Sequence, residues 1–113
     1  MNDLISYSDF TKIEIRLGTI ISAELNDKLR RPSFVLKIDF GHEIGIKKSS
    51  AQLTKNYNIE QLLDRQIAAV INFPNKQIGD LISEVLVLGF PDHNDEPILV
   101  STDKKLANGG KLY

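Results

Sequence analysis

Residues 34–50 constrain the fold more than any other part of the chain. Apolar side chains alternate with polar ones at Phe34, Leu36, Ile38 and Phe40, which is the period-two pattern of a half-buried antiparallel strand. Gly41 and His42 suit a two-residue hairpin loop, because glycine at the first turn position matches the twist of the strands. We therefore predict a hairpin whose apolar face continues through Ile44 and Ile46. The exposed face then carries Val35, Lys37, Asp39, Gly45, Lys47 and Ser49.

The rest of the chain has the pattern of short strands with two short helices. Alternation and apolar runs predict strands near residues 14–24, 66–73, 84–90 and 98–100, with a loop at 74–80. Cap signals predict a helical turn over residues 7–12, with Ser8 as its cap, and a second helix after Asn58, with Gln61 as the reciprocal capping partner. Gly18 predicts a bulge or sharp bend in the first strand.

This order of elements predicts a fold. Three strands, a helix and two further strands within about a hundred residues is the order of the five-stranded oligonucleotide/oligosaccharide-binding (OB) barrel. We expect an all-β domain with short helices over residues 1–113, an OB-fold barrel with extensions at residues 1–13 and 91–113. A short open β-sandwich is the alternative, and the helix between the third and fourth strands favours the barrel.

Composition argues against several classes of protein. The chain has no cysteine, so it has neither a disulfide frame nor a thiolate metal site. No apolar run approaches the roughly 18–20 residues that cross a bilayer, and the first residues lack the pattern of a secretory signal. We therefore expect a cytoplasmic protein without membrane insertion.

Charge is unevenly distributed along the chain, although the net charge is only −1. Residues 28–55 hold seven bases and two acids, whereas residues 80–103 hold six acids and no base. A polyanion is expected to bind the first sector and to be repelled by the second. A normally solvated surface with clustered charges is the equally weighted alternative.

Catalytic and metal-binding patterns are absent from the sequence. His42 and His93 lie in predicted turns without a nucleophile at a recognisable elbow. The spacing of Asp92, His93, Asp95 and Glu96 matches neither a calcium loop nor a zinc site. We expect no cofactor, no metal and no enzymatic activity.

Two segments have the chemistry of nucleic-acid binding. Lys47 and Lys48, followed by Ser49 and Ser50, offer amines for phosphates and hydroxyls for directional bonds to phosphate or ribose oxygens. The alternative is that one serine only caps the following helix. Residues 72–79 add the amide side chains of Asn72, Asn75 and Gln77 and the amine of Lys76, which suit base edges or sugar hydroxyls of unpaired RNA. Phe73 is expected either to stack on a base or to pack against the barrel rim.

Three blocks of the sequence occur in a fixed order: IDFGHEIGIKKSSAQ at residues 38–52, NFPNKQIG at 72–79 and SEVLVLGFP at 83–91. On these blocks the chain resembles the bacterial CsaA-like proteins, a branch of the tRNA-binding-domain family that also occurs at the ends of some methionyl- and phenylalanyl-tRNA synthetases. Where the wider family often has an arginine before the loop glycine and a Gly-Met pair after the serine, this chain has Ile78, Val85 and Leu86.

The resemblance implies a homodimer that binds tRNA and acts as a chaperone for unfolded preproteins in protein export; a purely peptide-binding chaperone is the alternative. The family's RNA contacts, together with the lysine of the OB-type ligand face, map onto Lys37, Lys47, Lys48, Ser50, Asn72, Lys76 and Ser83. An apolar groove for peptides is expected at Phe73, Ile78, Leu81 and Ile82. Apolar residues near both ends predict a dimer interface, and packing of both termini onto their own barrel is the alternative.

Overall fold

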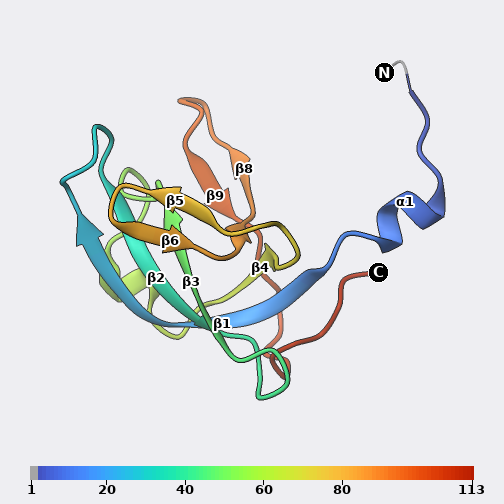
Figure 1. Ribbon diagram of the computed structural model, residues 1–113. Helices are drawn as coiled ribbons and strands as arrows, with labels where there is room; N and C mark the ends of the chain where they lie inside the picture. Colours follow the sequence, from blue (N-terminus) through green and yellow to red (C-terminus); the bar gives the residue numbers. More distant parts are fainter. Residues whose placement is uncertain (1–2) are drawn as a thin grey trace.

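Five antiparallel strands in the order β3–β2–β1–β4–β7 form the main sheet, which curls into a half-barrel (Figure 1). The computed structural model describes residues 3–113. The strands of this sheet are β1 (Ile15–Asn26), β2 (Ser33–Asp39), β3 (Ile46–Ala51), β4 (Gln66–Val70) and β7 (Leu86–Val87). Two hairpins lie beside it: β5 (Lys76–Ile78) with β6 (Leu81–Ser83), and β8 (Gly89–Pro91) with β9 (Pro97–Leu99). The expected all-β class with an OB-like five-strand arrangement is confirmed, and the β-sandwich alternative is wrong.

Strand β1 is the central strand of the sheet. Its first half pairs with β4, and its second half pairs with β2. A bulge is present, as predicted, but it lies between Ile20 and Ser22 rather than at Gly18. Gly18 instead allows close packing: a Cβ at this position would lie 2.6 Å from Ile38 Cγ2 and 2.7 Å from Phe40 Cδ1. The bulge shifts the alternation by one residue, so Ile20 and Ala23 both point into the core.

The β2–β3 hairpin has a longer loop than predicted, and the predicted faces of β3 are wrong. The Phe40 amide donates to the Gly45 carbonyl at 3.1 Å, which leaves four residues, 41–44, in the loop. Ile38 then lies opposite Lys47, and Leu36 opposite Ser49. Because directly opposed residues share a side of a sheet, Lys47 and Ser49 are on the core side, and Ile46 is on the outer side at 56% exposure.

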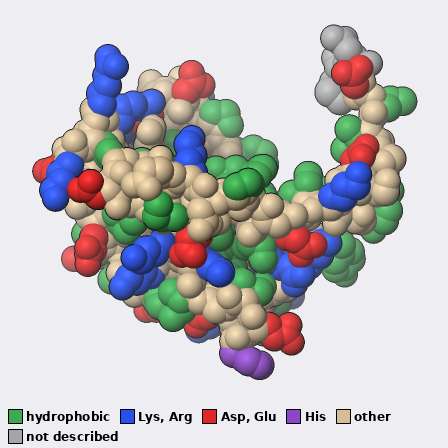
Figure 2. Space-filling model, in the orientation of Figure 1, with side chains coloured by type: hydrophobic (Ala, Val, Ile, Leu, Met, Phe, Trp, Pro, Cys, Tyr) green, Lys and Arg blue, Asp and Glu red, His purple; other side chains and the backbone are tan. Residues whose placement is uncertain are grey.

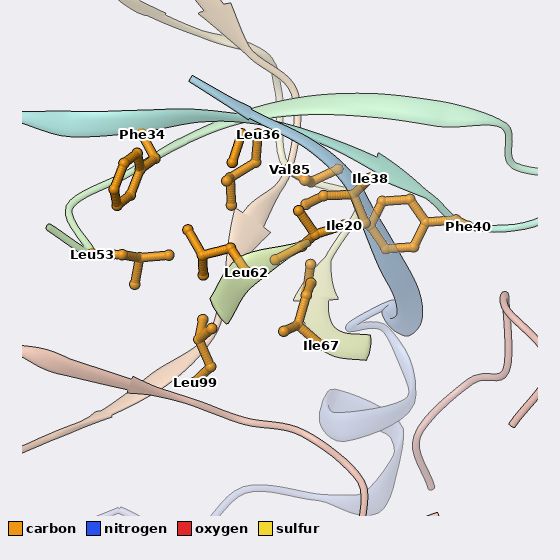
Figure 3. Packing of buried hydrophobic residues seen from close by; sticks show 12 residues of the cluster. Ile20, Phe34, Leu36, Ile38, Phe40, Leu53, Leu62, Ile67, Val85 and Leu99 are labelled. Carbon is orange, nitrogen blue, oxygen red and sulfur yellow. The ribbon is translucent and has the colours of Figure 1, made fainter. Parts of the chain in front are cut away.

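The core lies inside the curl of the half-barrel (Figure 3). The predicted inward face of β2 is confirmed, since its four apolar residues at 34, 36, 38 and 40 are all buried. Helix α2 (Ile59–Leu62) contributes the fully buried Leu62 and carries the predicted reciprocal cap between Asn58 and Gln61. Burial of each such side chain contributes about 1.5–3 kcal/mol. The labelled core residues are Ile20, Phe34, Leu36, Ile38, Phe40, Leu53, Leu62, Ile67, Val85 and Leu99.

Residues 3–14 form an arm that projects from the half-barrel (Figure 1). Helix α1 (Tyr7–Thr11) lies in this arm, and no residue of the arm is buried. The cap of α1 is Ser6, with Asp9 as its reciprocal partner, and not Ser8 as predicted. No helix within residues 3–113 is long and apolar enough to cross a membrane.

The C-terminal tail, residues 100–113, runs along β1. The Leu17 amide donates to the Gly110 carbonyl at 3.0 Å, and the Leu112 amide donates to the Ile15 carbonyl at 2.9 Å. The Gln66 side chain makes two hydrogen bonds to the backbone of Leu106: its Nε2 donates to the Leu106 carbonyl, and its Oε1 accepts from the Leu106 amide. The tail therefore packs onto its own barrel, whereas the arm is bonded to the barrel and the tail at its base, residues 11–14, and is exposed over residues 3–9.

Two predicted segments differ from the structure. The predicted loop at 74–80 contains β5 and the turn to β6, in which Gly79 and Asp80 link Ile78 to Leu81. The predicted strand at 84–90 is divided into β7 and β8 at Leu88. The Leu88 amide donates to the carbonyl of Ala68 in β4, while its carbonyl accepts from Val100 beyond β9. The strand divides because it changes partners at this residue.

Candidate nucleic-acid interface

Two lysines lie directly opposite each other on the outer face of the β2–β3 hairpin. Lys37 of β2 pairs with Lys48 of β3, and both side chains are exposed. Like charges in directly opposed positions destabilise a sheet. Within residues 3–113, neither lysine has a carboxylate within 4.0 Å. This pair is therefore available to an external anion.

Lys47 is on the other side of β3 from this pair. It lies opposite Ile38 and is half-buried. The predicted exposed face that joined Lys37 with Lys47 is wrong, because the register of the hairpin puts Lys48 beside Lys37 instead. The Lys47 amine nevertheless has no carboxylate within 4.0 Å in the described chain.

The predicted serines form a junction between β2, β3 and β6. The Ser50 amide donates to Ser83 Oγ at 3.1 Å, and the Ser33 and Ser50 hydroxyls lie 3.2 Å apart. Ser83 and Ser33 are buried. Ser49, also buried, donates its hydroxyl to the Val85 carbonyl at 3.0 Å. These hydroxyls connect the edge of β3 to the segment that follows β6, a role that sequence reasoning missed for Ser33 and Ser49.

The loop that follows β4 places Asn72 and Lys76 in different surroundings. Asn72 Oδ1 accepts from the Glu14 amide at 3.0 Å, and its Nδ2 donates to the Lys12 carbonyl at 2.7 Å. Its amide group therefore holds the base of the arm. Lys76 is exposed on β5 directly opposite Ser83, so its backbone lies next to the serine junction. RNA contact by either residue stays a prediction.

The four apolar residues predicted to bind peptides do not share one groove. Phe73 and Ile78 line a cavity of about 650 Å³. Leu81 lines a second cavity of about 460 Å³ beside the β1–β2 loop. Ile82 is partly exposed but lines neither. The larger cavity also contains Leu53, Leu86, Val87 and Leu99, which the sequence did not indicate.

Within residues 3–113, four bases are paired with acids: Lys12, Arg16, Arg31 and Lys111. Arg16 and Lys111 both contact Glu14, at 2.7 and 2.8 Å. The hydrogen bond from Lys111, followed by that from Arg16, lowers the pKa of Glu14. Arg31 in the β1–β2 loop lies 3.3 Å from Glu96, so the basic and acidic sectors of the sequence meet at this point.

The acidic turn at residues 92–96 has a structural explanation. The side-chain amide of Asn56 donates to Asp92 at 2.9 Å, and the amides of Glu96 and Asn94 donate to its other oxygen. These bonds, with that from Asn56 first, lower the pKa of Asp92. Within residues 3–113, no group of three or more His, Asp or Glu side chains has the geometry of a metal site.

Figure 2 shows basic side chains in separate groups on one face, with acidic side chains between them. Apolar side chains are exposed between the half-barrel and the arm in the same view. This face therefore presents local cationic positions beside exposed apolar side chains rather than one continuous basic surface.

Comparison with known proteins gives a consistent result. Residues 15–111 match the family described as "Putative tRNA binding domain". A methionine–tRNA ligase of Methanococcoides burtonii is 34% identical over 111 residues, which is 98% of this chain and 16% of that protein. The chain thus spans about one sixth of the length of this curated relative.

Two solved structures resemble the chain over nearly its whole length. The chaperone CsaA of Bacillus anthracis has a TM-score of 0.90 and 43% identity, covering 98% of this chain and 100% of that one. The CsaA chaperone protein of Picrophilus torridus has a TM-score of 0.90 and 44% identity, covering 97% and 100%.

Proposed function

Because the chain belongs to the tRNA-binding domain family and is CsaA-like in structure, we propose that it binds tRNA through the outer face of β2 and β3. The observation that carries this proposal is the directly opposed pair of Lys37 and Lys48, exposed and without acidic partners in the described chain. An RNA phosphate between the two amines relieves their repulsion.

The proposed role is binding without catalysis. Further phosphates are proposed to reach Lys47, on the other side of β3, and Lys76 on β5, while the bond from the Ser50 amide to Ser83 keeps β3 and β6 in register. A cytoplasmic location is part of the proposal, because tRNA is found there. Binding driven by phosphates depends strongly on salt, with each contact contributing about −0.7 to −0.9 to the logarithmic slope.

The test is a titration of fluorescently labelled tRNA at several salt concentrations. In the variant Lys37→Ala/Lys48→Ala, affinity should fall and the slope should flatten by about 1.4–1.8, twice the contribution of one contact. The matched control is Lys104→Ala/Lys105→Ala, which removes the same charge from exposed positions in the tail. Equal affinities and slopes for the two variants would contradict the proposal.

A homodimer is the second part of the proposal, with residues 1–13 and 91–113 at its interface. Within the described arm, Leu4, Ile5 and Tyr7 are 73–98% exposed. An apolar cavity of about 270 Å³ lies between β1 and the tail, lined by Ile15, Leu17, Leu106 and Leu112 among others. Two copies paired at these surfaces bury apolar groups that one copy leaves in water.

The dimer is tested by the molar mass of the protein in solution. Light scattering should give twice the mass of 12.7 kDa for the unmodified chain and the monomer mass for Leu4→Ser/Ile5→Ser. A monomer for the unmodified chain at the highest concentration used contradicts this part and leaves the RNA proposal standing.

Capture of unfolded preproteins during export is a second candidate function. The cavity of about 650 Å³ favours it, because it is lined mainly by apolar residues and has Phe73 and Leu86 at its exposed rim. The protein should suppress aggregation of a denatured client, and Leu86→Ser should weaken this effect. Ile46→Ser is the control, with a similar exposure at a position outside the cavity. Suppression without tRNA binding identifies a purely peptide-binding chaperone.

A further inference from the structure

Strand β7 has a free backbone edge. The Leu88 amide donates to the Ala68 carbonyl at 3.0 Å, and Val87 lies opposite Ala69. In an antiparallel ladder, hydrogen-bonded pairs alternate with pairs whose N–H and C=O groups point away from each other. The N–H and C=O of Val87 therefore point away from β4. Within residues 3–113 neither group has a hydrogen-bond partner.

The neighbouring positions on the same side are closed, which makes Val87 distinctive. The carbonyl of Val85, two residues earlier, accepts the hydroxyl of Ser49 at 3.0 Å. Glu84, one residue before Val85, makes two hydrogen bonds with Lys48 of β3. The Lys48 amide donates to Glu84 Oε1, and the Lys48 carbonyl accepts from the Glu84 amide. The edge is thus sealed up to Val85 and open at Val87.

The open position borders the apolar cavity. Leu86, Val87 and Leu88 all line the cavity of about 650 Å³, whose other walls include Leu53 and Ile78. A bound segment at this edge has backbone partners on one side and an apolar surface for its side chains. This combination of an exposed donor and acceptor with an apolar groove matches an extended peptide.

The sequence of the edge lacks the charged and proline residues that discourage strand pairing, although β7 itself is only two residues long. Natural edges carry lysine, proline or inward charges that prevent association with other chains. Residues 85–88 are Val-Leu-Val-Leu, with Glu84 and Pro91 only outside them. An unprotected apolar edge is a hazard unless another strand occupies it.

We propose that an extended, unfolded peptide segment adds to the free edge of β7 as an extra strand, with its backbone bonded to the N–H and C=O of Val87. This inference rests on the proposed capture of unfolded preproteins and specifies its chemistry. Main-chain bonding makes capture tolerant of sequence, while the cavity selects segments in which apolar side chains alternate with polar ones.

N-methylated peptides test the mode of binding without any change to the protein. The probe is a labelled eight-residue peptide in which leucine and valine alternate with serine and threonine. Two further versions carry N-methyl groups on alternate amides, in one frame or the other. All three peptides have the same side chains, but in a bound strand only one of the two sets of alternate amides can bond to β7. Methylation in that frame should weaken binding about tenfold or more, and in the other frame about twofold or less.

Hydrogen exchange locates the bound strand. The Val87 amide should exchange at least about tenfold more slowly when the unmodified peptide is bound, because it gains a partner. The Leu88 amide, already bonded to Ala68, is the internal control and should change little. Tight binding of all three peptides with no change at Val87 contradicts strand addition and leaves peptide capture intact. Failure of the unmodified peptide to bind contradicts both.

Discussion

The half-barrel and the arm contain the same kinds of apolar residue in opposite environments. Ile20 of β1 is fully buried and touches the other core side chains, whereas Ile5 of the arm is 73% exposed. The core side chains of the half-barrel are therefore buried by its own residues, whereas Leu4, Ile5 and Tyr7 of the arm are exposed. We conclude that burial within the chain stabilises the half-barrel, and that residues 3–10 of the arm lack such burial.

The largest expected effect compares one substitution in the two regions. Ile20→Ala should lower the free energy of unfolding by about 2–5 kcal/mol, because it leaves a cavity among packed side chains. Ile5→Ala should change it by less than about 0.5 kcal/mol at protein concentrations where the chain is monomeric. Urea denaturation followed by circular dichroism measures both. Equal losses at the two positions would mean that the arm packs on its own half-barrel.

A second comparison uses glycines. Gly18→Ala places a Cβ 2.6 Å from Ile38 Cγ2, inside the core, so it should cost about 1–3 kcal/mol of unfolding free energy. The matched control Gly110→Ala, in the tail, meets no atom within 4 Å and should be nearly neutral. Both are measured by urea denaturation. A neutral Gly18→Ala would show that β1 and β2 can separate slightly without loss of packing.

Sequence reasoning succeeded where burial alone decides the structure. The alternation of β2 was sufficient to identify its inward face, and the cap at Asn58 was sufficient to place α2. The faces of β3 could not be obtained in this way. They depend on the bond between Phe40 and Gly45 across a four-residue loop, and this contact leaves little trace in the local pattern.

The hairpin of β5 and β6 did have a local signal. Gly79 and Asp80 are a two-residue turn between short strands, with Gly79 at a φ of 60°, which glycine adopts at little cost. Site residues were harder to predict, since lysine and serine are common at surfaces. The opposition of Lys37 and Lys48 and the free edge at Val87 both follow from strand register, and register requires the three-dimensional structure.

The third prediction concerns the junction between the arm and the half-barrel, where Asn72 bonds to the base of the arm. Asn72→Ala removes two bonds to the backbone of Lys12 and Glu14. It should reduce the unfolding free energy by about 1 kcal/mol and speed hydrogen exchange at the Glu14 amide, because the base of the arm is released. The backbone amides of Ile20 and its neighbours in β1 should keep their protection against hydrogen exchange. If exchange at Glu14 is unchanged, other contacts are sufficient to fix the arm.

The same variant separates two roles for Asn72. If the residue only positions the arm, tRNA affinity per monomer should be unchanged while the mass in solution falls towards that of the monomer. A drop in affinity with the dimer intact supports direct RNA contact instead.

The smallest expected effect is the dependence of this joint on pH. Lys111 and Arg16 hold the carboxylate of Glu14 and lower its pKa in the folded chain. A carboxyl whose folded pKa is lowered contributes stability above its unfolded pKa, about 4.3, and the contribution disappears as pH falls through the folded value. The unfolding free energy of the unmodified chain should therefore exceed that of Glu14→Gln at about pH 7, and this difference should shrink below about pH 4.3.

Glu43→Gln is the matched control, because Glu43 is exposed in the β2–β3 loop and has no ion pair within residues 3–113. Its stability difference from the unmodified chain should be small at every pH. If the difference in unfolding free energy between the unmodified chain and Glu14→Gln stays constant as the pH falls below about 4.3, the charge of Glu14 does not contribute to joining the arm to the tail. The hydrogen bonds from Asn72 and Ile71 would then account for the junction without the ion pairs.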